Sequence, residues 1–225
     1  MGKILINPDE FAIERHVMVE EQLRRRGITN EGVLRAMESV PRHEFVTPDW
    51  RNRAYQDEPL PIGEEQTISQ PYIVAAMSAA LHLHGDERVL EIGTGCGYQA
   101  AVLSCLAREV HTMERHAELA SAATRRLARL GYPNVHIHGG DGSLGLPESA
   151  PFGAILVAAA APHVPPPLLE QLADGGRMII PVGTGDHQEL QLIDRHGDTF
   201  HTRFLDPCRF VPLLGRFGWK ESPAS

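Results

Sequence analysis

Short apolar runs alternate with helical patterns through the middle of the chain, and this alternation constrains the fold more than any other feature. The runs occupy residues 88–92, 109–113, 135–138, 154–157 and 177–181. Parallel strands need a long crossover connection, usually a helix, whereas antiparallel strands can be joined by a tight turn. The pattern therefore predicts an α/β fold with a mostly parallel, doubly wound sheet that carries helices on both faces.

The N-terminal third has a different pattern. Helical periodicity runs over residues 14–37, where Gly27 breaks the pattern and Asn30 can cap a second helix. Residues 41–67 contain four prolines and little periodicity, which predicts a long irregular connection that faces the substrate. A further helix is expected over residues 71–84, ahead of the first strand of the sheet.

The C-terminal part adds an antiparallel element. Two strand-like runs, at residues 189–195 and 199–205, flank a turn signal at His196-Gly197-Asp198, so we expect a hairpin at the edge of the sheet. A chain of 225 residues fits one domain. The expected parts of this single domain are a helical and loop extension at residues 1–70 that forms part of a substrate cleft, a core at 71–215 and a tail at 216–225.

Composition narrows the classes of partner and location. The net charge of −8 and the pI of about 5.8 argue against nucleic acid or an anionic membrane as a partner. No apolar run approaches the roughly 20 residues that span a bilayer, and the first residues lack the pattern of a secretory signal. Three cysteines are too few for a disulfide framework. We therefore expect a soluble protein of the cytoplasm.

The most informative motif is a glycine-rich turn after the first strand of the sheet, VLEIGTGCGYQ at residues 89–99. Glycines let backbone N–H groups approach a ligand at the carboxyl end of the strand. The spacing of Gly93, Gly95 and Gly97 differs from the G-x-G-x-x-G of a dinucleotide site, and the turn offers no Lys or Arg to a pyrophosphate. With Glu91 inside the strand, this favours a ligand that carries a cationic amino-acid end and no phosphate, such as S-adenosylmethionine.

Acidic residues at the ends of the next two strands extend this hypothesis. Glu114 ends the second strand about 20 residues after the turn, where a carboxylate can accept both ribose hydroxyls. Asp141 and Gly142 follow the third strand, where an adenine amino group can be read. As alternatives, Glu114 forms a surface ion pair and the Asp141-Gly142 pair is an ordinary turn. The order of the motifs along the sheet favours the cofactor site.

Several motifs together resemble the protein-L-isoaspartate (D-aspartate) O-methyltransferase family, from residue 18 to residue 215. The matching segments are MVEEQLRRRGI (18–28), VPRHEFV (40–46), AYQDEPLPIGEEQTISQPYIVAAM (54–77), VLEIGTGCGYQAAVL (89–103), GDGSLGLPESAPF (140–152), GGRMIIPVG (175–183) and RFVPLLG (209–215). QTISQP is the most specific part. The resemblance implies a Rossmann-like S-adenosylmethionine-dependent methyltransferase fold. It also implies a repair enzyme that methylates the α-carboxylate of L-isoaspartyl residues in damaged proteins, with D-aspartyl residues as a second candidate substrate.

The resemblance also implies the site residues. Ser69 matches the family's active-site serine and is expected to hold the isoaspartyl carboxylate; its alternative role is to cap the helix that Pro71 opens. The expected contacts of S-adenosylmethionine and its product S-adenosylhomocysteine are Gly63, Glu64, Gln66, Thr67, Ser69, Glu91, Gly93, Gly95, Glu114, Asp141 and Gly142. The expected lining of the peptide cleft is Tyr55, Pro59, Leu60, Ile62, Val211, Pro212 and Leu213, with loop packing as the alternative.

Some residues depart from the family pattern. Cys96 occupies a position where the family commonly has serine. Gly153 replaces the family's usual aspartate, and His163 stands where glutamate is frequent in the family.

The twelve histidines are not spaced as the ligands of a metal ion are, so we expect no metal. The alternatives that remain open are a methyltransferase for another acceptor, a nicotinamide oxidoreductase and a cofactor-binding homologue without activity. We expect a monomer.

Overall fold

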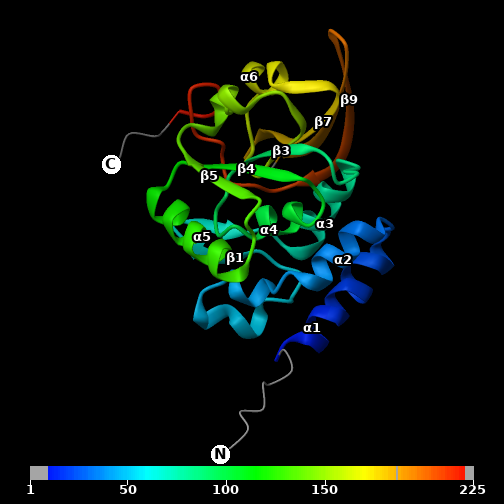
Figure 1. Ribbon diagram of the computed structural model, residues 1–225, viewed down its shortest axis with the longest axis vertical. Coiled ribbons are helices and arrows are strands. Elements are labelled where there is room, and N and C mark those ends of the chain that lie inside the picture. The colour runs from blue at the N-terminus through cyan, green and yellow to red at the C-terminus, as the bar shows by residue number, and fades with distance from the viewer. Residues whose placement is uncertain (1–9, 186, 221–225) are drawn as a thin grey trace, which may run out of the picture.

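The centre of the computed structural model is a seven-stranded sheet with the order β5-β4-β3-β6-β7-β8-β9 (Figure 1). The structure describes residues 10–185 and 187–220. The strands are β3 (Arg88–Ile92), β4 (Glu109–Glu114), β5 (Val135–Gly139), β6 (Phe152–Val157), β7 (Leu172–Thr184), β8 (His187–His196) and β9 (Thr199–Cys208). β3 to β7 pair in parallel, whereas β8 and β9 are antiparallel to their neighbours. The predicted parallel sheet and the predicted hairpin are confirmed.

Helices cover both faces of this sheet, as the predicted doubly wound arrangement requires (Figure 1). α3 (Pro71–Ala80), α4 (Tyr98–Ser104) and α5 (Ala117–Leu130) lie on one face, and α6 (Pro166–Glu170) lies on the other. β3 pairs with β4 on one side and with β6 on the other, so the chain order reverses beside it. Ligands of such sheets bind outside the carboxyl ends of the strands at this reversal, and the glycine-rich turn begins there.

The helical N-terminal extension forms as its periodicity predicts. It comprises α1 (Ala12–Val17), the π-helical segment η1 (Met18–Leu23), the 3₁₀ turn η2 (Arg24–Arg26) and α2 (Glu31–Ser39). Gly27 ends the first part with a φ of 94°, a conformation that glycine adopts without steric cost. The side-chain oxygen of Asn30 accepts the N–H of Val33 at 3.1 Å, so Asn30 caps α2 as expected.

The segment that we predicted to be irregular, residues 41–67, contains more structure than expected. It holds the 3₁₀ helices η3 (Arg42–Glu44) and η4 (Pro48–Arg53), and then an antiparallel hairpin of β1 (Leu60–Gly63) and β2 (Gln66–Ile68). The prediction missed this hairpin because its turn carries no Asn-Gly or similar signal. Glu64 and Glu65 instead adopt positive φ values of 48° and 56°.

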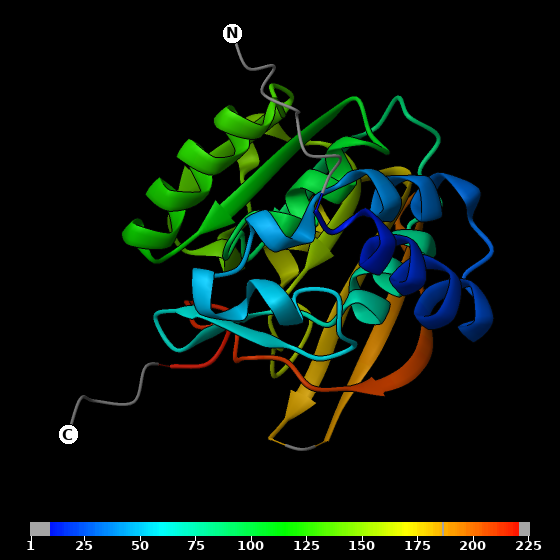
Figure 2. The same cartoon turned by 90° about the horizontal axis from the view of Figure 1, so that it is seen from below.

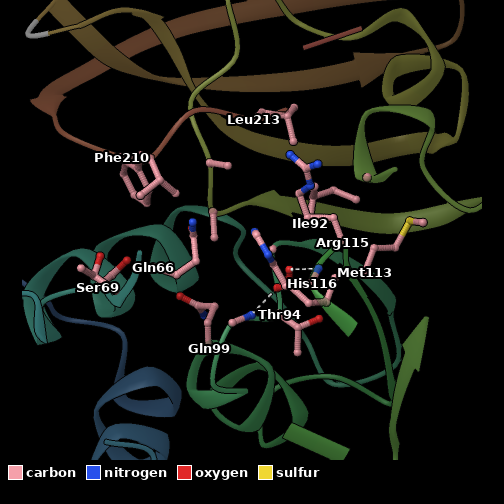
Figure 3. Close-up of a pocket in the computed structure, with 18 of the residues that line it drawn as sticks. Gln66, Ser69, Ile92, Thr94, Gln99, Met113, Arg115, His116, Phe210 and Leu213 are labelled. Carbon is pink, nitrogen blue, oxygen red and sulfur yellow. Dashed lines mark hydrogen bonds between the residues drawn. The ribbon is translucent and has the colours of Figure 1, made fainter. Parts of the chain in front are cut away.

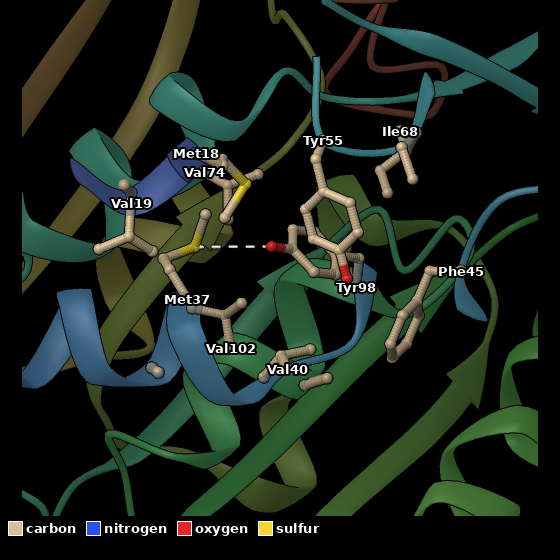
Figure 4. Close-up of a cluster of buried hydrophobic side chains, with 14 of the residues drawn as sticks. Met18, Val19, Met37, Val40, Phe45, Tyr55, Ile68, Val74, Tyr98 and Val102 are labelled. Atoms are coloured by element: carbon tan, nitrogen blue, oxygen red, sulfur yellow. Dashed lines mark hydrogen bonds between the residues drawn. The ribbon is translucent and has the colours of Figure 1, made fainter. Parts of the chain in front are cut away.

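A buried cluster joins the N-terminal extension to the core, and Tyr98 at the start of α4 lies in its middle (Figure 4). The Tyr98 hydroxyl donates to the sulfur of Met37 at 3.7 Å, and its ring meets the edge of Phe45 at a centroid distance of 5.4 Å. The guanidinium of Arg42 lies 4.8 Å from the same ring, and its Nε donates to the backbone oxygen of Ala54 at 2.6 Å. Because these partners come from η3, α2 and the connection before β1, the extension packs directly on the element that follows the glycine-rich turn.

The C-terminal segment, residues 210–219, returns across the carboxyl ends of the strands and runs beside the β1–β2 hairpin (Figure 2). It is held by the loop after β6: the N–H of Ala160 donates to Val211 O, and the N–H of Leu213 donates to Ala160 O, both at 2.8 Å. The Trp219 indole N–H also donates to Ala160 O at 3.0 Å. Across residues 10–185 and 187–220, no helix is both long and apolar enough to cross a membrane.

Candidate functional site

A pocket with about 950 Å³ of empty space lies outside the carboxyl ends of β3 and β4 (Figure 3). Six parts of the chain form its walls: the glycine-rich turn with the start of α4, the end of β4 with the two residues after it, the loops after β5 and after β6, the segment from β2 to α3, and the C-terminal segment. Ten predicted residues line it, namely Gln66, Thr67, Ser69, Gly93, Gly95, Glu114, Gly142, Val211, Pro212 and Leu213. Apolar walls with a small number of polar groups are typical of a small-molecule or cofactor site.

The glycine-rich turn has the shape that brings backbone close to a ligand. Gly93, Gly95 and Gly97 have φ values of 95°, 53° and 89°, which side-chain-bearing residues adopt only at a cost. The N–H groups of Gly93 and Thr94 both donate to Met113 O, at 2.9 and 3.1 Å, which fixes the turn against the end of β4. The turn therefore presents a rigid, open backbone surface to the pocket.

Glu114 is the charged side chain that the structure sets into the pocket wall at the end of β4. Its Oε2 accepts the N–H of Gly95 at 2.8 Å and its Oε1 accepts the N–H of His116 at 2.9 Å. A carboxylate offers about four acceptor positions, so each oxygen keeps one for a ligand. Two fixed acceptors side by side suit the paired hydroxyls of a ribose, and the predicted contact with a ribose stays a prediction.

Glu91, which we expected to contact the cofactor, lies elsewhere. Its side chain is 0% exposed and does not line the pocket, because it points from β3 into the interior beneath the turn. Its Oε2 lies 2.5 Å from the hydroxyl oxygen of Thr112. Burial, together with the nearby Glu114 carboxylate, raises the pKa of Glu91 to about 8. A neutral acid is therefore the main form at pH 7, and the predicted pairing of Glu91 with a cationic group is wrong.

Asp141 also acts differently from the prediction. One carboxylate oxygen accepts the N–H and the hydroxyl of Ser143, at 2.9 and 2.7 Å, and the other accepts the N–H of Arg216 at 2.7 Å. These donors lower the pKa of Asp141 in spite of its partial burial. The side chain lies outside the main pocket and anchors the C-terminal segment, while its neighbour Gly142 lines the pocket as predicted.

Ser69 lies where the main pocket meets a second hollow, which we call the side groove. The side groove has about 400 Å³ of empty space and is lined by Pro59, Thr67, Ser69, Gln70, Ile73, Ala158, Arg209, Phe210 and Val211. Gln70, and not Ser69, is the N-cap of α3, and no side chain makes the capping hydrogen bond. The capping alternative for Ser69 is therefore wrong. Its hydroxyl has no hydrogen-bond partner among residues 10–185 and 187–220 and stands at the junction of the two hollows.

Several residues predicted to line the peptide cleft or the cofactor site belong to the packing around it. Tyr55 is 7% exposed and its hydroxyl lies 2.8 Å from Nδ1 of His43. Leu60 is a core residue, and Ile62 packs against the glycine-rich turn, where a Cβ on Gly95 would lie 3.2 Å from its Cδ1. Gly63 and Glu64 form the tip of the β1–β2 hairpin, outside the pocket lining, and the Glu64 carboxylate lies 3.7 Å from the His116 ring. Of the residues before β1, Pro59 lines the side groove.

The sequence reasoning missed several pocket residues. Thr94 and Gln99 come from the turn and the first turn of α4, Arg115 and His116 follow Glu114, and Phe210 precedes the predicted Val211 (Figure 3). Their positions next to predicted residues were the available signal. Among the described residues, no group of His, Cys, Asp or Glu is arranged to hold a metal ion.

The three departures from the family pattern leave the pocket walls in place. At Gly153 a Cβ would lie 3.0 Å from Cγ of Glu87, whose carboxylate accepts the N–H groups of His84 and Gly85. His163 is exposed and lies outside the pocket. Cys96 lines the pocket as a buried residue, and burial raises the pKa of its thiol, so it stays protonated and unreactive at neutral pH.

Comparison with known proteins agrees with this geometry. Residues 14–218 match the family model described as protein-L-isoaspartate(D-aspartate) O-methyltransferase. The chain is 53% identical to the protein-L-isoaspartate O-methyltransferase of Koribacter versatilis, over 95% of this chain and 96% of the relative. It is 54% identical to the protein of that name from Roseiflexus castenholzii, over 93% and 96% of the two chains.

Solved structures are similar over the same range. A protein-L-isoaspartate O-methyltransferase with 31% identity superposes with a TM-score of 0.83, covering 91% of this chain and 67% of that one. A β-aspartate methyltransferase of Plasmodium falciparum in complex with S-adenosyl-L-homocysteine has 25% identity and a TM-score of 0.75, covering 89% and 98%. The predicted fold is therefore confirmed.

Proposed function

The chain belongs to the protein-L-isoaspartate(D-aspartate) O-methyltransferase family, and we infer from this membership that it transfers the methyl group of S-adenosylmethionine to the α-carboxylate of L-isoaspartyl residues in proteins and peptides. It is an enzyme, and its cofactor is S-adenosyl-L-methionine. One observation carries the assignment of the site. The pocket and the side groove meet at two polar side chains, Thr67 and Ser69, and Ser69 is the one that matches the family's active-site serine.

The main pocket fits S-adenosylmethionine in its chemistry. Glu114 offers two fixed acceptors, which we propose hold the ribose hydroxyls. The glycine-rich turn carries no cationic side chain, in keeping with a ligand that has no phosphate. We propose that Gln66, Thr67 and the C-terminal segment close over the cofactor from the other side. When bound, the cofactor supplies a sulfonium methyl group as the electrophile.

The residues at the junction have to align the reactants and exclude water. An α-carboxylate has a pKa of roughly 3.5, so it is already ionised at neutral pH and needs no general base. We propose that the isoaspartyl residue lies in the side groove with its carboxylate at Ser69, and that the hydroxyl of Ser69 donates to one carboxylate oxygen while the other faces the pocket. Phe210 and Val211 line both hollows and reduce the access of water to the reacting atoms.

Substitution of Ser69 tests this arrangement. For Ser69→Ala we expect a loss of roughly 10-fold to 100-fold in kcat/KM for an isoaspartyl peptide, the equivalent of one hydrogen bond to a charged group. The dissociation constant of S-adenosylhomocysteine, measured by calorimetry, should change by less than about threefold, because the serine is proposed to act on the carboxylate and not on the cofactor. Ser69→Thr, which keeps the hydroxyl, should retain more activity. An alanine variant with wild-type kcat/KM would show that Ser69 does not contact the substrate.

We further propose that the protein acts as a monomer in the cytoplasm and does not use nucleic acid as a partner. All the walls of the pocket come from one chain, so the site is complete without a second copy. The three cysteines are free, which suits a reducing compartment. The net charge of −8 disfavours nucleic acid.

A further inference from the structure

Glu91 is a buried carboxyl group directly beneath the cofactor-binding turn, and it has no charged partner among the residues that the structure describes. It lies on β3, between Thr112 of β4 and Leu156 of β6 in the register of the sheet. One oxygen lies 2.5 Å from the Thr112 hydroxyl. The other, Oε1, is buried and has no hydrogen-bond partner within the described part of the chain. Such a group is costly to keep ionised, since a buried charge needs a partner.

A chain of hydroxyl groups connects Glu91 to the pocket. The Thr112 hydroxyl oxygen lies 2.7 Å from that of Thr94, and Thr94 lines the pocket between Gly93 and Gly95. Thr94 is 3% exposed, so this pair is shielded from bulk water. The three side chains therefore form a continuous hydrogen-bonded path from the interior to the pocket wall.

The protonation state of Glu91 determines which hydroxyl group donates and which accepts in each hydrogen bond of this path. An ionised carboxylate only accepts, so Thr112 must donate to it and Thr94 must then donate to Thr112. A neutral acid can donate from Oε2 to Thr112, which frees Thr112 to donate to Thr94. A proton on Oε1 instead would leave a buried donor unpaired, which is costly. The hydroxyl hydrogen of Thr94 is thus available at the pocket only while Glu91 is protonated.

We propose that Glu91 is a positioning residue that acts as a neutral acid, and that it holds the Thr94 hydroxyl as a hydrogen-bond donor toward the cofactor through Thr112. This inference rests on the proposed function, because it needs the pocket to bind the cofactor. It assigns different roles to two carboxyl groups near one turn: Glu114 accepts hydrogen bonds at the pocket wall, and Glu91 is neutral behind it.

The titratable groups around Glu91 favour its neutral form. The Glu114 carboxylate on β4 opposes a second negative charge, and the Cys96 thiol of the turn is held neutral by burial. From β6 the facing residue, Leu156, is apolar. Desolvation is the largest cause of the raised pKa of Glu91, about 8, against an ordinary value of 4.5. Ionisation should therefore begin in the mildly alkaline range.

Calorimetric titration of S-adenosylhomocysteine from pH 7 to pH 9.5 tests the proposal, with wild type and Glu91→Gln compared. Glutamine has the same shape, stays neutral and can donate to Thr112. The ammonium of the ligand titrates identically in both experiments, so the ratio of the two dissociation constants isolates Glu91. Between pH 7.5 and pH 9 we expect this ratio, wild type over variant, to rise roughly eightfold if binding requires the protonated form. Glu118→Gln, exposed on α5, should follow the wild type.

Thermal stability gives a second readout that does not depend on the cofactor. The folded pKa of Glu91 is raised, so the folded state holds the proton more tightly and wild-type stability falls as the pH rises from about 4.5 to about 8. The Glu91→Gln variant has no carboxyl group at this position, so it does not lose this stability as the pH rises. The Tm of Glu91→Gln relative to wild type should therefore increase from pH 5 to pH 8.

The outcomes separate the inference from the function on which it rests. Parallel binding curves for wild type and Glu91→Gln, with a constant difference in Tm, would overturn the inference while the cofactor site stands. Failure of the wild type to bind S-adenosylhomocysteine at any pH would overturn both. If Glu91→Gln does not fold, Thr112→Val replaces it. Valine has nearly the shape of threonine but no hydroxyl group, so this variant interrupts the hydrogen-bonded path. It should bind S-adenosylhomocysteine more weakly than the wild type at pH 7, and its dissociation constant should change less with pH.

Discussion

Glu114→Gln is expected to weaken the binding of S-adenosylhomocysteine by about 100-fold or more. Each ribose hydroxyl would lose a charged acceptor, and one hydrogen bond to a charged group contributes roughly 1.5–3 kcal/mol. The amide also cannot reproduce the present contacts, because both Glu114 oxygens accept a backbone N–H, from Gly95 and His116, and an NH₂ group would face one of them. Calorimetry at pH 7 measures the change directly.

Glu118→Gln is the matched control for this experiment, since it removes one carboxylate from an exposed position on α5. It should bind as the wild type does. A Glu114→Gln variant that binds within about threefold of wild type would contradict the ribose contact. In that case the carboxylate serves only to fix the turn.

Tyr98→Ala is expected to lower the free energy of unfolding by about 3–5 kcal/mol, the usual cost of removing a large buried aromatic side chain. Tyr98 is 1% exposed and contacts Phe45, Met37 and Arg42, all of them in the N-terminal extension. Its loss would leave a cavity and uncover a buried guanidinium. Urea denaturation followed by circular dichroism gives the measurement.

Tyr98→Phe is the control, because it keeps the ring and removes only the hydroxyl contact with the Met37 sulfur; we expect a cost of less than about 1.5 kcal/mol. The same experiment tests the single-domain prediction. If the extension and the core form one cooperative unit, both variants and the wild type should unfold in one transition. Two separate transitions would show that the extension is a unit of its own, and a cost near zero for Tyr98→Ala would show that the cluster does not join them.

The strands of the parallel sheet could be predicted because each one is marked by a short apolar run within the sequence itself. Buried parallel strands need apolar runs, and the connections between them have room for helices, so the runs from 88–92 to 177–181 could be located. The β1–β2 hairpin could not be located, because its turn residues Glu64 and Glu65 adopt left-handed conformations and neither belongs to a residue type that indicates such a turn.

The candidate site was predicted in part, and the misses have one physical cause. A sequence shows that a carboxylate is present but not which way its side chain points. Glu114 and Glu91 lie on neighbouring strands, yet one faces the pocket and the other faces the interior. Asp141 was placed correctly after the third strand, but its oxygens are taken by Ser143 and the C-terminal segment. Such choices depend on neighbours that are distant in the sequence.

The most direct test of the account is transfer of a labelled methyl group to paired peptides that differ only in an isoaspartyl or a normal aspartyl linkage. We predict a base-labile methyl ester on the isoaspartyl peptide alone, and its loss, together with the loss of cofactor binding, in Glu114→Gln. Equal labelling of both peptides, or none in a protein that binds S-adenosylhomocysteine, would contradict it. Either result would mean that the side groove serves another methyl acceptor.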